Sequence, residues 1–192
     1  MTSDPGSSSR STRELILECS RRLFSQRSFS QVTIKDIAEE AGVSSALVIK
    51  YFINKECLFG QTIDFEESAR RLFSGEFSEL GYTAVYETLT APADAPYSTV
   101  RTLVIGSGDE NSLKSVGKKI QEDLKEVLVD RIESEAPQPN PHPQIRAQAA
   151  LSLIIGLSMM RRVGDPNFRD YPRKQLLDYY AGLFQQIVDG VA

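Results

Sequence analysis

The sequence predicts an all-α fold, with a short N-terminal module of three helices followed by a larger helical body. Apolar residues recur at spacings of three and four in almost every segment, which is the period of an amphipathic helix. Convincing alternation at period two is absent from the sequence, which disfavours strands. Ser, Thr and Asn residues also stand directly before several apolar-periodic segments, where their side chains can cap a helix.

Length and composition are those of an ordinary globular chain. The 192 residues can bury a core, and 41% hydrophobic with 25% charged residues is a typical balance. The apolar runs are far shorter than the roughly 20 residues of a membrane span, and the N-terminus is too polar for a secretory signal. Because Cys19 and Cys57 each lie in an apolar-periodic segment, we expect buried free thiols and a cytoplasmic location.

The net charge of −4 is unevenly distributed along the chain. Residues 1–58 carry eight Lys and Arg against seven Asp and Glu, whereas residues 59–192 carry 14 against 19. The acidic excess therefore belongs to the C-terminal part. A near-neutral N-terminal module can still bind DNA if its cations share one face.

The N-terminal module is predicted from caps and from helical periodicity. A first helix spans residues 12 to about 27, where apolar residues recur at helical spacing. Thr33 is expected to cap a second, short helix in a capping box with Asp36. Gly42 ends that helix, since glycine readily adopts a left-handed conformation, and Ser44 caps the third.

The C-terminal body is predicted to contain longer helices. Asn54 caps one that starts at Lys55 and continues through Phe77 as a single connector. Further helices are expected over residues 83–90, 97–105, 110–135, 144–163 and 174–191. The alternate prolines of residues 137–143 exclude a helix there.

Three short helices with a tight Gly turn between the second and the third form a helix-turn-helix. In that geometry the third helix enters the major groove of DNA. The sequence therefore divides into a disordered tail at residues 1–11, a DNA-binding domain at 12–58, and a larger helical domain at 59–192.

The N-terminal module resembles the N-terminal domain of TetR-family repressors from Thr12 to Leu58, without a gap. The residues that carry the resemblance are Thr12-Arg13, Ile16-Leu17, Leu23-Phe24, Phe29, Thr33, Ile37-Ala38, Ala41-Gly42-Val43-Ser44, Tyr51-Phe52, Lys55-Glu56 and Leu58. Two positions depart from the family pattern: Ile49 stands where Tyr is common, and Arg27 where Gly is usual. We therefore expect few direct hydrogen bonds to bases, because few polar side chains face the groove.

The resemblance implies a set of residues that contact phosphates or base edges. They are Thr33, Lys35, Ser44, Ser45, Ala46, Leu47, Ile49, Lys50, Tyr51 and Lys55. Thr33, Ser44, Tyr51 and Lys55 would bind phosphate, and the apolar members would contact thymine methyl groups. Thr33 and Ser44 also serve as helix caps, and Lys50 and Lys55, taken alone, could be solvated surface charges.

The resemblance also implies that residues 59–192 are an effector-binding and dimerisation domain, with a dimer interface and an effector pocket. The two last helices would pair with those of a second copy through Leu153, Leu157, Met160, Leu176, Tyr180, Leu183, Phe184 and Ile187, although the 144–163 helix could instead be a central core helix. A pocket for a largely apolar effector would be lined by Phe73, Phe77, Tyr82, Tyr86, Leu89, Tyr97, Leu103, Ile120 and Leu124, residues that equally suit a plain core.

The function expected from these features is a ligand-responsive transcriptional regulator, most often a repressor in the family that the chain resembles. It would bind a palindromic operator in double-stranded DNA as a homodimer and would be released by a small-molecule effector. The alternatives are a DNA-binding adaptor without a small-molecule ligand and a helical enzyme or binding protein. The sequence shows no catalytic set, phosphate loop or metal-ligand spacing, so we expect no enzyme activity, no cofactor and no membrane partner.

Overall fold

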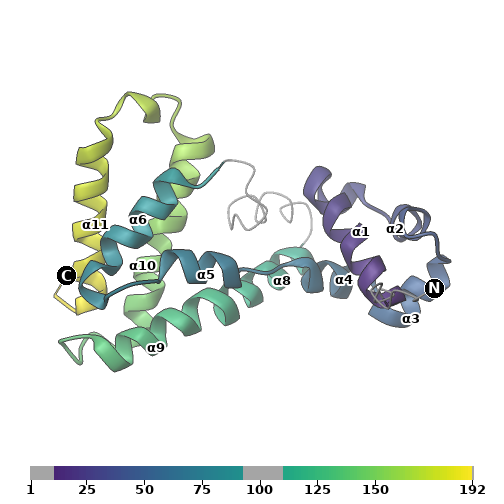
Figure 1. Cartoon of the computed structure of the whole chain (residues 1–192), viewed down its shortest axis with the longest axis horizontal. Helices are drawn as coiled ribbons and strands as arrows, with labels where there is room; N and C mark the ends of the chain where they lie inside the picture. Colours follow the sequence, from purple (N-terminus) through teal and green to yellow (C-terminus); the bar gives the residue numbers. More distant parts are fainter. Residues whose placement is uncertain (1–10, 93–109, 192) are drawn as a thin grey trace, which may run out of the picture. The chain divides into compact units, whose positions relative to one another are not determined.

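The computed structural model describes residues 11–92 and 110–191, apart from the side chain of Val163. Within these ranges the chain is helical and holds no strand, which confirms the all-α prediction (Figure 1). The helix predicted at 97–105 lies outside the described residues. The described residues form two compact units: residues 11–63 with 110–115, and residues 64–92 with 116–191. In the described part of the chain, no helix has the length and apolar character needed to cross a membrane.

The first unit consists of short helices around an aromatic core. Its elements are α1 (Thr12–Gln26), a 3-10 turn (Phe29–Gln31), α2 (Ile34–Glu40), α3 (Ser45–Phe52), α4 (Lys55–Thr62) and the beginning of α8 (Glu110–Ile120). The rings of Phe24, Phe29 and Phe59 are buried together, with centroids 4.9–6.0 Å apart. This cluster joins α1, the 3-10 turn and α4. Helix α2 packs on α1, and α3 packs on α4.

The second unit consists of longer helices. Its elements are α5 (Glu66–Leu72), a 3-10 turn (Phe77–Glu79), α6 (Leu80–Thr90), the end of α8, a π-helical segment (Gln121–Lys125), α9 (Glu126–Glu135), α10 (Pro143–Met159), a second π-helical segment (Met160–Gly164), a 3-10 turn (Phe168–Asp170) and α11 (Arg173–Asp189). The run from Glu110 to Glu135 is continuously helical, as the sequence predicts. Helices α6, α10 and α11 pack on one another, and α9 packs on α10 (Figure 1).

The prediction of one connector helix from Lys55 through Phe77 is wrong. Helix α4 ends at Thr62, Ile63 is extended, and α5 begins only at Glu66. Both Ile63 and Phe65 are buried, although residues two apart point to different sides of a helix. The backbone N–H of Phe65 also donates to the Asp123 carboxylate at 3.0 Å, a long-range contact that no local pattern reveals.

The expectation of two buried thiols holds for one cysteine only. Cys19 is buried on α1, and its Sγ lies 3.6 Å from the carbonyl oxygen of Glu40. Burial raises the pKa of the Cys19 thiol. Cys57 is exposed, because the neighbouring Leu58 and Phe59 are the residues that α4 turns into the core.

Candidate nucleic-acid interface

Helices α2 and α3 are joined by a turn whose caps are complete. The Thr33 hydroxyl accepts the Asp36 N–H at 3.1 Å, and the Asp36 carboxylate accepts the Thr33 N–H at 2.9 Å. These bonds, with Arg27 and Lys35 nearby, hold the pKa of Asp36 below its usual value. The predicted capping box is therefore present. A phosphate contact from the Thr33 backbone N–H would compete with Asp36, whereas the Thr33 hydroxyl keeps its own proton to donate.

The turn itself follows from a glycine and a serine. Gly42 has φ +64°, the left-handed conformation that ends α2, and the Val43 N–H donates to the Ala38 carbonyl at 2.9 Å. The Ser44 hydroxyl then accepts the Leu47 N–H at 3.2 Å and caps α3. A hydroxyl that accepts can still donate its own proton, so Ser44 keeps a donor at the positive end of the helix.

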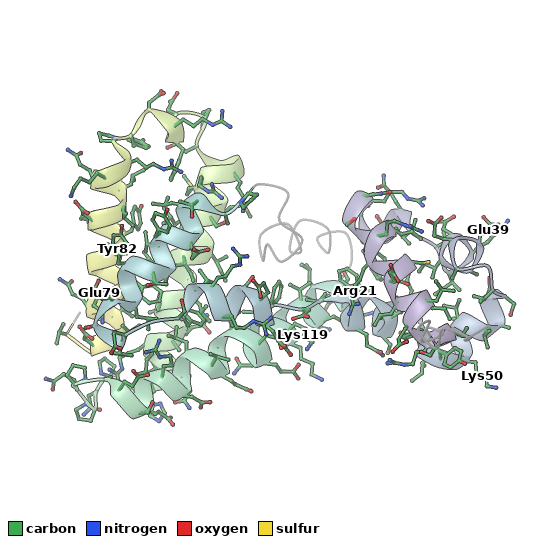
Figure 2. The ribbon with its side chains drawn as sticks, viewed as in Figure 1. Arg21, Glu39, Lys50, Glu79, Tyr82 and Lys119 are labelled. Atoms are coloured by element: carbon green, nitrogen blue, oxygen red, sulfur yellow. The ribbon has the colours of Figure 1, made fainter. Side chains whose placement is uncertain are left out.

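Helix α3 has one buried side and one exposed side. Val48 and Phe52 are 0% and 1% exposed and anchor the helix to the first unit. The remaining side chains are exposed except Leu47, which is half-buried, and we call the exposed set the α3 face: Ser45, Ala46, Ile49, Lys50 and Tyr51. The sequence of α3 holds no Asp or Glu, and Lys50 projects outward from it (Figure 2). The α3 face is therefore free of the carboxylates that would repel a phosphate backbone.

The carboxylates of α2 are all engaged by basic side chains. The Glu39 carboxylate lies 3.7 Å from the Lys35 Nζ, and the Arg22 guanidinium pairs with the Glu40 carboxylate. Asp36 is 3.7 Å from Arg27. Pairs as exposed as Lys35–Glu39 contribute little stability, so Lys35 can exchange its partner for a phosphate at small cost.

The structure gives Lys55 a role inside the first unit. Its Nζ donates to the carbonyls of Phe29 and Val32 at 3.0 and 3.1 Å, and it lies 4.1 Å from the centroid of the Phe29 ring. An ammonium group has three donors, so only one remains for the phosphate contact predicted from the sequence. Lys55 thus stabilises the segment that leads into α2, through its bonds to the carbonyls of Phe29 and Val32.

Ile53 is a feature that the sequence reasoning missed. It follows α3 directly, is 74% exposed and has φ +68° with ψ −58°. The Asn54 N–H donates to the Phe52 carbonyl at 2.7 Å across it, which makes Ile53 the centre of a strained γ-turn. A β-branched residue gives no local signal for this conformation, which glycine adopts far more readily.

Comparison with known proteins agrees with this geometry. The family described as "Bacterial regulatory proteins, tetR family" matches residues 16–62, and "Tetracyclin repressor-like, C-terminal domain" matches residues 79–188. The chain belongs to the TetR family. The members of this family are DNA-binding transcription regulators, and neither the family nor the fold is that of an enzyme.

Individual relatives of this TetR-family chain are distant. The HTH-type transcriptional regulator AcrR of Shigella flexneri is 35% identical over 94 residues, which are 49% of this chain and 39% of that protein. Salmonella enterica GusR has a similar structure, with a TM-score of 0.66 and 15% identity over 98% of both chains. E. coli NemR in its reduced form has a similar structure too, with a TM-score of 0.62 and 17% identity over 92% of this chain and 97% of that one. At these identities the solved structures show a shared fold.

The predicted effector residues are dispersed in the TetR-family C-terminal domain. Phe73, Phe77, Leu89 and Leu124 are buried and Ile120 is half-buried. Tyr82 and Tyr86 are instead about half exposed on α6, with their ring centroids 5.9 Å apart in a stacked arrangement. Tyr97 and Leu103 lie outside the described residues. Leu89 lines a cavity of about 440 Å³ near the C-terminal end of α6.

The predicted dimer residues fall into two groups. Leu157 and Phe184 are buried within the protomer, so their side chains are not available to a partner. The others are half-buried or exposed on α10, α11 and the segment after α10: Leu153, Met160, Leu176, Tyr180, Leu183 and Ile187.

In the described part of the chain, no group of three or more His, Cys, Asp and Glu side chains lies close enough together to hold a metal ion.

Proposed function

We propose that this TetR-family chain is a ligand-responsive transcriptional repressor that binds a palindromic operator as a homodimer and releases it when a small effector binds. The observation that carries the proposal is the α3 face, an exposed row without carboxylates that directly follows a fully capped turn. A helix presented in this way enters the major groove with its N-terminal residues toward the base edges.

The contacts on DNA divide by chemistry. Lys50 and Tyr51 donate to phosphates, and Ser44 does so at the N-terminus of α3. Ala46 and the exposed part of Ile49 have no polar atom in their side chains, so they are suited to thymine methyl groups. Affinity then rests mainly on phosphates, and sequence choice rests on methyl contacts and DNA shape.

Dimerisation is part of the proposal because one short helix reads only a few base pairs. The six accessible residues named above give α10 and α11 a partly exposed apolar surface that a second copy would cover. Two copies would place their α3 helices about 34–36 Å apart, which requires a palindromic operator. An effector that favours a different spacing would weaken DNA binding by the coupling free energy, typically about 1–3 kcal/mol.

The test is a mobility-shift titration of the whole protein on DNA from upstream of its own coding region, at several salt concentrations. Lys50→Gln should weaken binding and reduce the dependence of log K on log salt by about one per protomer, because one phosphate contact is lost. Lys118→Gln is the matched control, since Lys118 is similarly exposed on α8 and pairs only with Glu122 at 3.4 Å among the described residues. Equal slopes for the two variants, or no retardation at low salt, would refute the proposed interface.

A further inference from the structure

Arginines gather where the C-terminal end of α6 meets the segment between α10 and α11. Arg161 donates to the carbonyls of Leu89 and Ala91 at 3.0 and 2.7 Å. Arg162 donates to the carbonyl of Pro92 at 3.1 Å. These bonds satisfy carbonyls that the end of a helix leaves without partners. Arg173 also donates to the Leu89 carbonyl, at 3.4 Å. A fourth arginine, Arg169, lies beside them without such a bond among the described residues.

A cavity opens between these side chains. It has a volume of about 440 Å³, within the range of about 300–1,000 Å³ of small-molecule sites. Its lining residues are Leu89, Arg161, Arg162, Phe168, Arg169, Tyr171, Arg173 and Leu176. The lining therefore combines apolar and aromatic side chains with guanidinium groups, and no Asp or Glu of the described residues contributes to it.

Within the described part of the chain, the positive charge of three of these arginines is poorly compensated. Burial, and then the neighbouring charges of Arg162 and Arg173, lower the pKa of Arg161. In the described part of the chain, Arg161, Arg169 and Arg173 form no ion pair, and the buried Nε of Arg161 has no hydrogen-bond partner. The nearby carboxylate of Asp165 acts instead on Tyr171, whose pKa it raises. Like charges held together beside a cavity cost free energy unless an anion joins them.

We infer that this arginine cavity binds a small organic oxyanion, in which a carboxylate or phosphate is attached to an apolar body. The oxyanion would lie between the guanidinium groups, whose planar N–H donors fit two oxygens at once. The apolar body would contact Phe168, Leu89 and Leu176. The inference deepens the proposed function, since it assigns the effector an acidic group that the sequence did not predict.

The test is calorimetric titration of the whole protein, without DNA, with benzoate, phenyl phosphate and neutral benzamide. We expect at least one anion to bind and benzamide, which matches benzoate in shape, to bind at least about tenfold more weakly. The stronger of the two anions identifies the acidic group. If neither anion binds better than benzamide, the inference is overturned, and the arginines serve only to cap α6.

Variants locate the site. Arg169→Gln and Arg173→Gln should each weaken anion binding about tenfold, the loss expected for one charged hydrogen bond. Arg169 is exposed and forms no hydrogen bond with the described residues, so its variant should fold even if Arg173→Gln does not. Arg21→Gln on α1 is the control, because Arg21 is also an exposed arginine (Figure 2). Unchanged binding in a folded Arg169→Gln would place the anion elsewhere and overturn the inference. DNA binding by the unliganded protein is measured separately, so failure here leaves the proposed function standing.

Discussion

Replacing Gly81 by Ala tests how closely α6 packs on α11. A Cβ atom at Gly81 would lie 2.3 Å from the carbonyl oxygen of Ala181 and 2.9 Å from the backbone nitrogen of Gln185. The N–H of Gly81 also donates to the side-chain oxygen of Gln185 at 2.9 Å. Because the obstructing atoms belong to the α11 backbone, no change of side-chain rotamer can make room for the methyl group.

The expected cost follows from two opposed effects. Alanine favours a helix over glycine by about 1 kcal/mol. Overpacking in a core costs about 1–3 kcal/mol or more, and a clash with backbone lies at the upper end. We therefore expect Gly81→Ala to lower the free energy of unfolding by about 2 kcal/mol, which corresponds to about 4–8 °C in Tm for a chain of this size.

Thermal unfolding followed by far-ultraviolet circular dichroism measures this effect. Gly117→Ala is the matched control, since Gly117 is also helical and a Cβ there meets no described atom within 4 Å. That variant should raise the free energy of unfolding by about 0.5–1 kcal/mol. A Gly81→Ala protein as stable as the wild type would show that α6 and α11 do not approach as closely as described.

Three further predictions concern the DNA-binding unit. Ile49→Tyr should tighten binding across different operators, because a hydroxyl on the α3 face adds a phosphate donor; weaker binding in a mobility shift would mean that Ile49 reads a base methyl group. Ile53→Gly should raise the free energy of unfolding by about 1 kcal/mol, because glycine relieves the positive φ of Ile53, and urea titration would reveal no gain if that strain were absent. Asp36→Asn should destabilise the protein at about pH 7 but not in strong acid. Because the pKa of Asp36 is lower in the folded protein than in the unfolded chain, its carboxylate contributes stability above the ordinary pKa of about 4, and this stability is lost as the pH falls through the folded-state pKa. A pH-independent difference in urea unfolding would contradict the capping role.

The features that the sequence predicted correctly depend on neighbouring residues. Thr33 with Asp36, Gly42 and Ser44 each act within one helical turn, so their residue types and spacing already contain the cap. The family resemblance over Thr12 to Leu58 has the same origin, because the spacings within one short module are fixed. The bounds of the longer helices were predicted closely where one stripe of apolar residues ran unbroken, as from Glu110 to Glu135.

The features that the sequence could not predict depend on residues far apart in the chain. The break after α4 places Phe65 against Asp123, and the apolar stripe continues across it, so periodicity alone favours an unbroken helix. Lys55 looks like a free surface cation until the fold brings the carbonyls of Phe29 and Val32 to its Nζ. The arginine cavity joins Leu89 to residues some seventy positions later, as in the bond from Arg161 to Leu89, whose sequence separation is 72.

The position of the arginine cavity suggests how an effector would act in the proposed repressor. Leu176 lines the cavity and is also one of the residues expected at the dimer interface, and Met160 of that interface directly precedes Arg161. An anion that draws the guanidinium groups together would therefore shift the segment that connects α10 to α11, the two helices expected to pair with the partner. Since α3 carries a single cation, binding of one protomer alone would be weak, and strong binding would require both copies of the proposed dimer at the correct spacing. In the proposed mechanism, a small change at the dimer interface would then be sufficient to release the operator, without any contact between the effector and the DNA-binding unit.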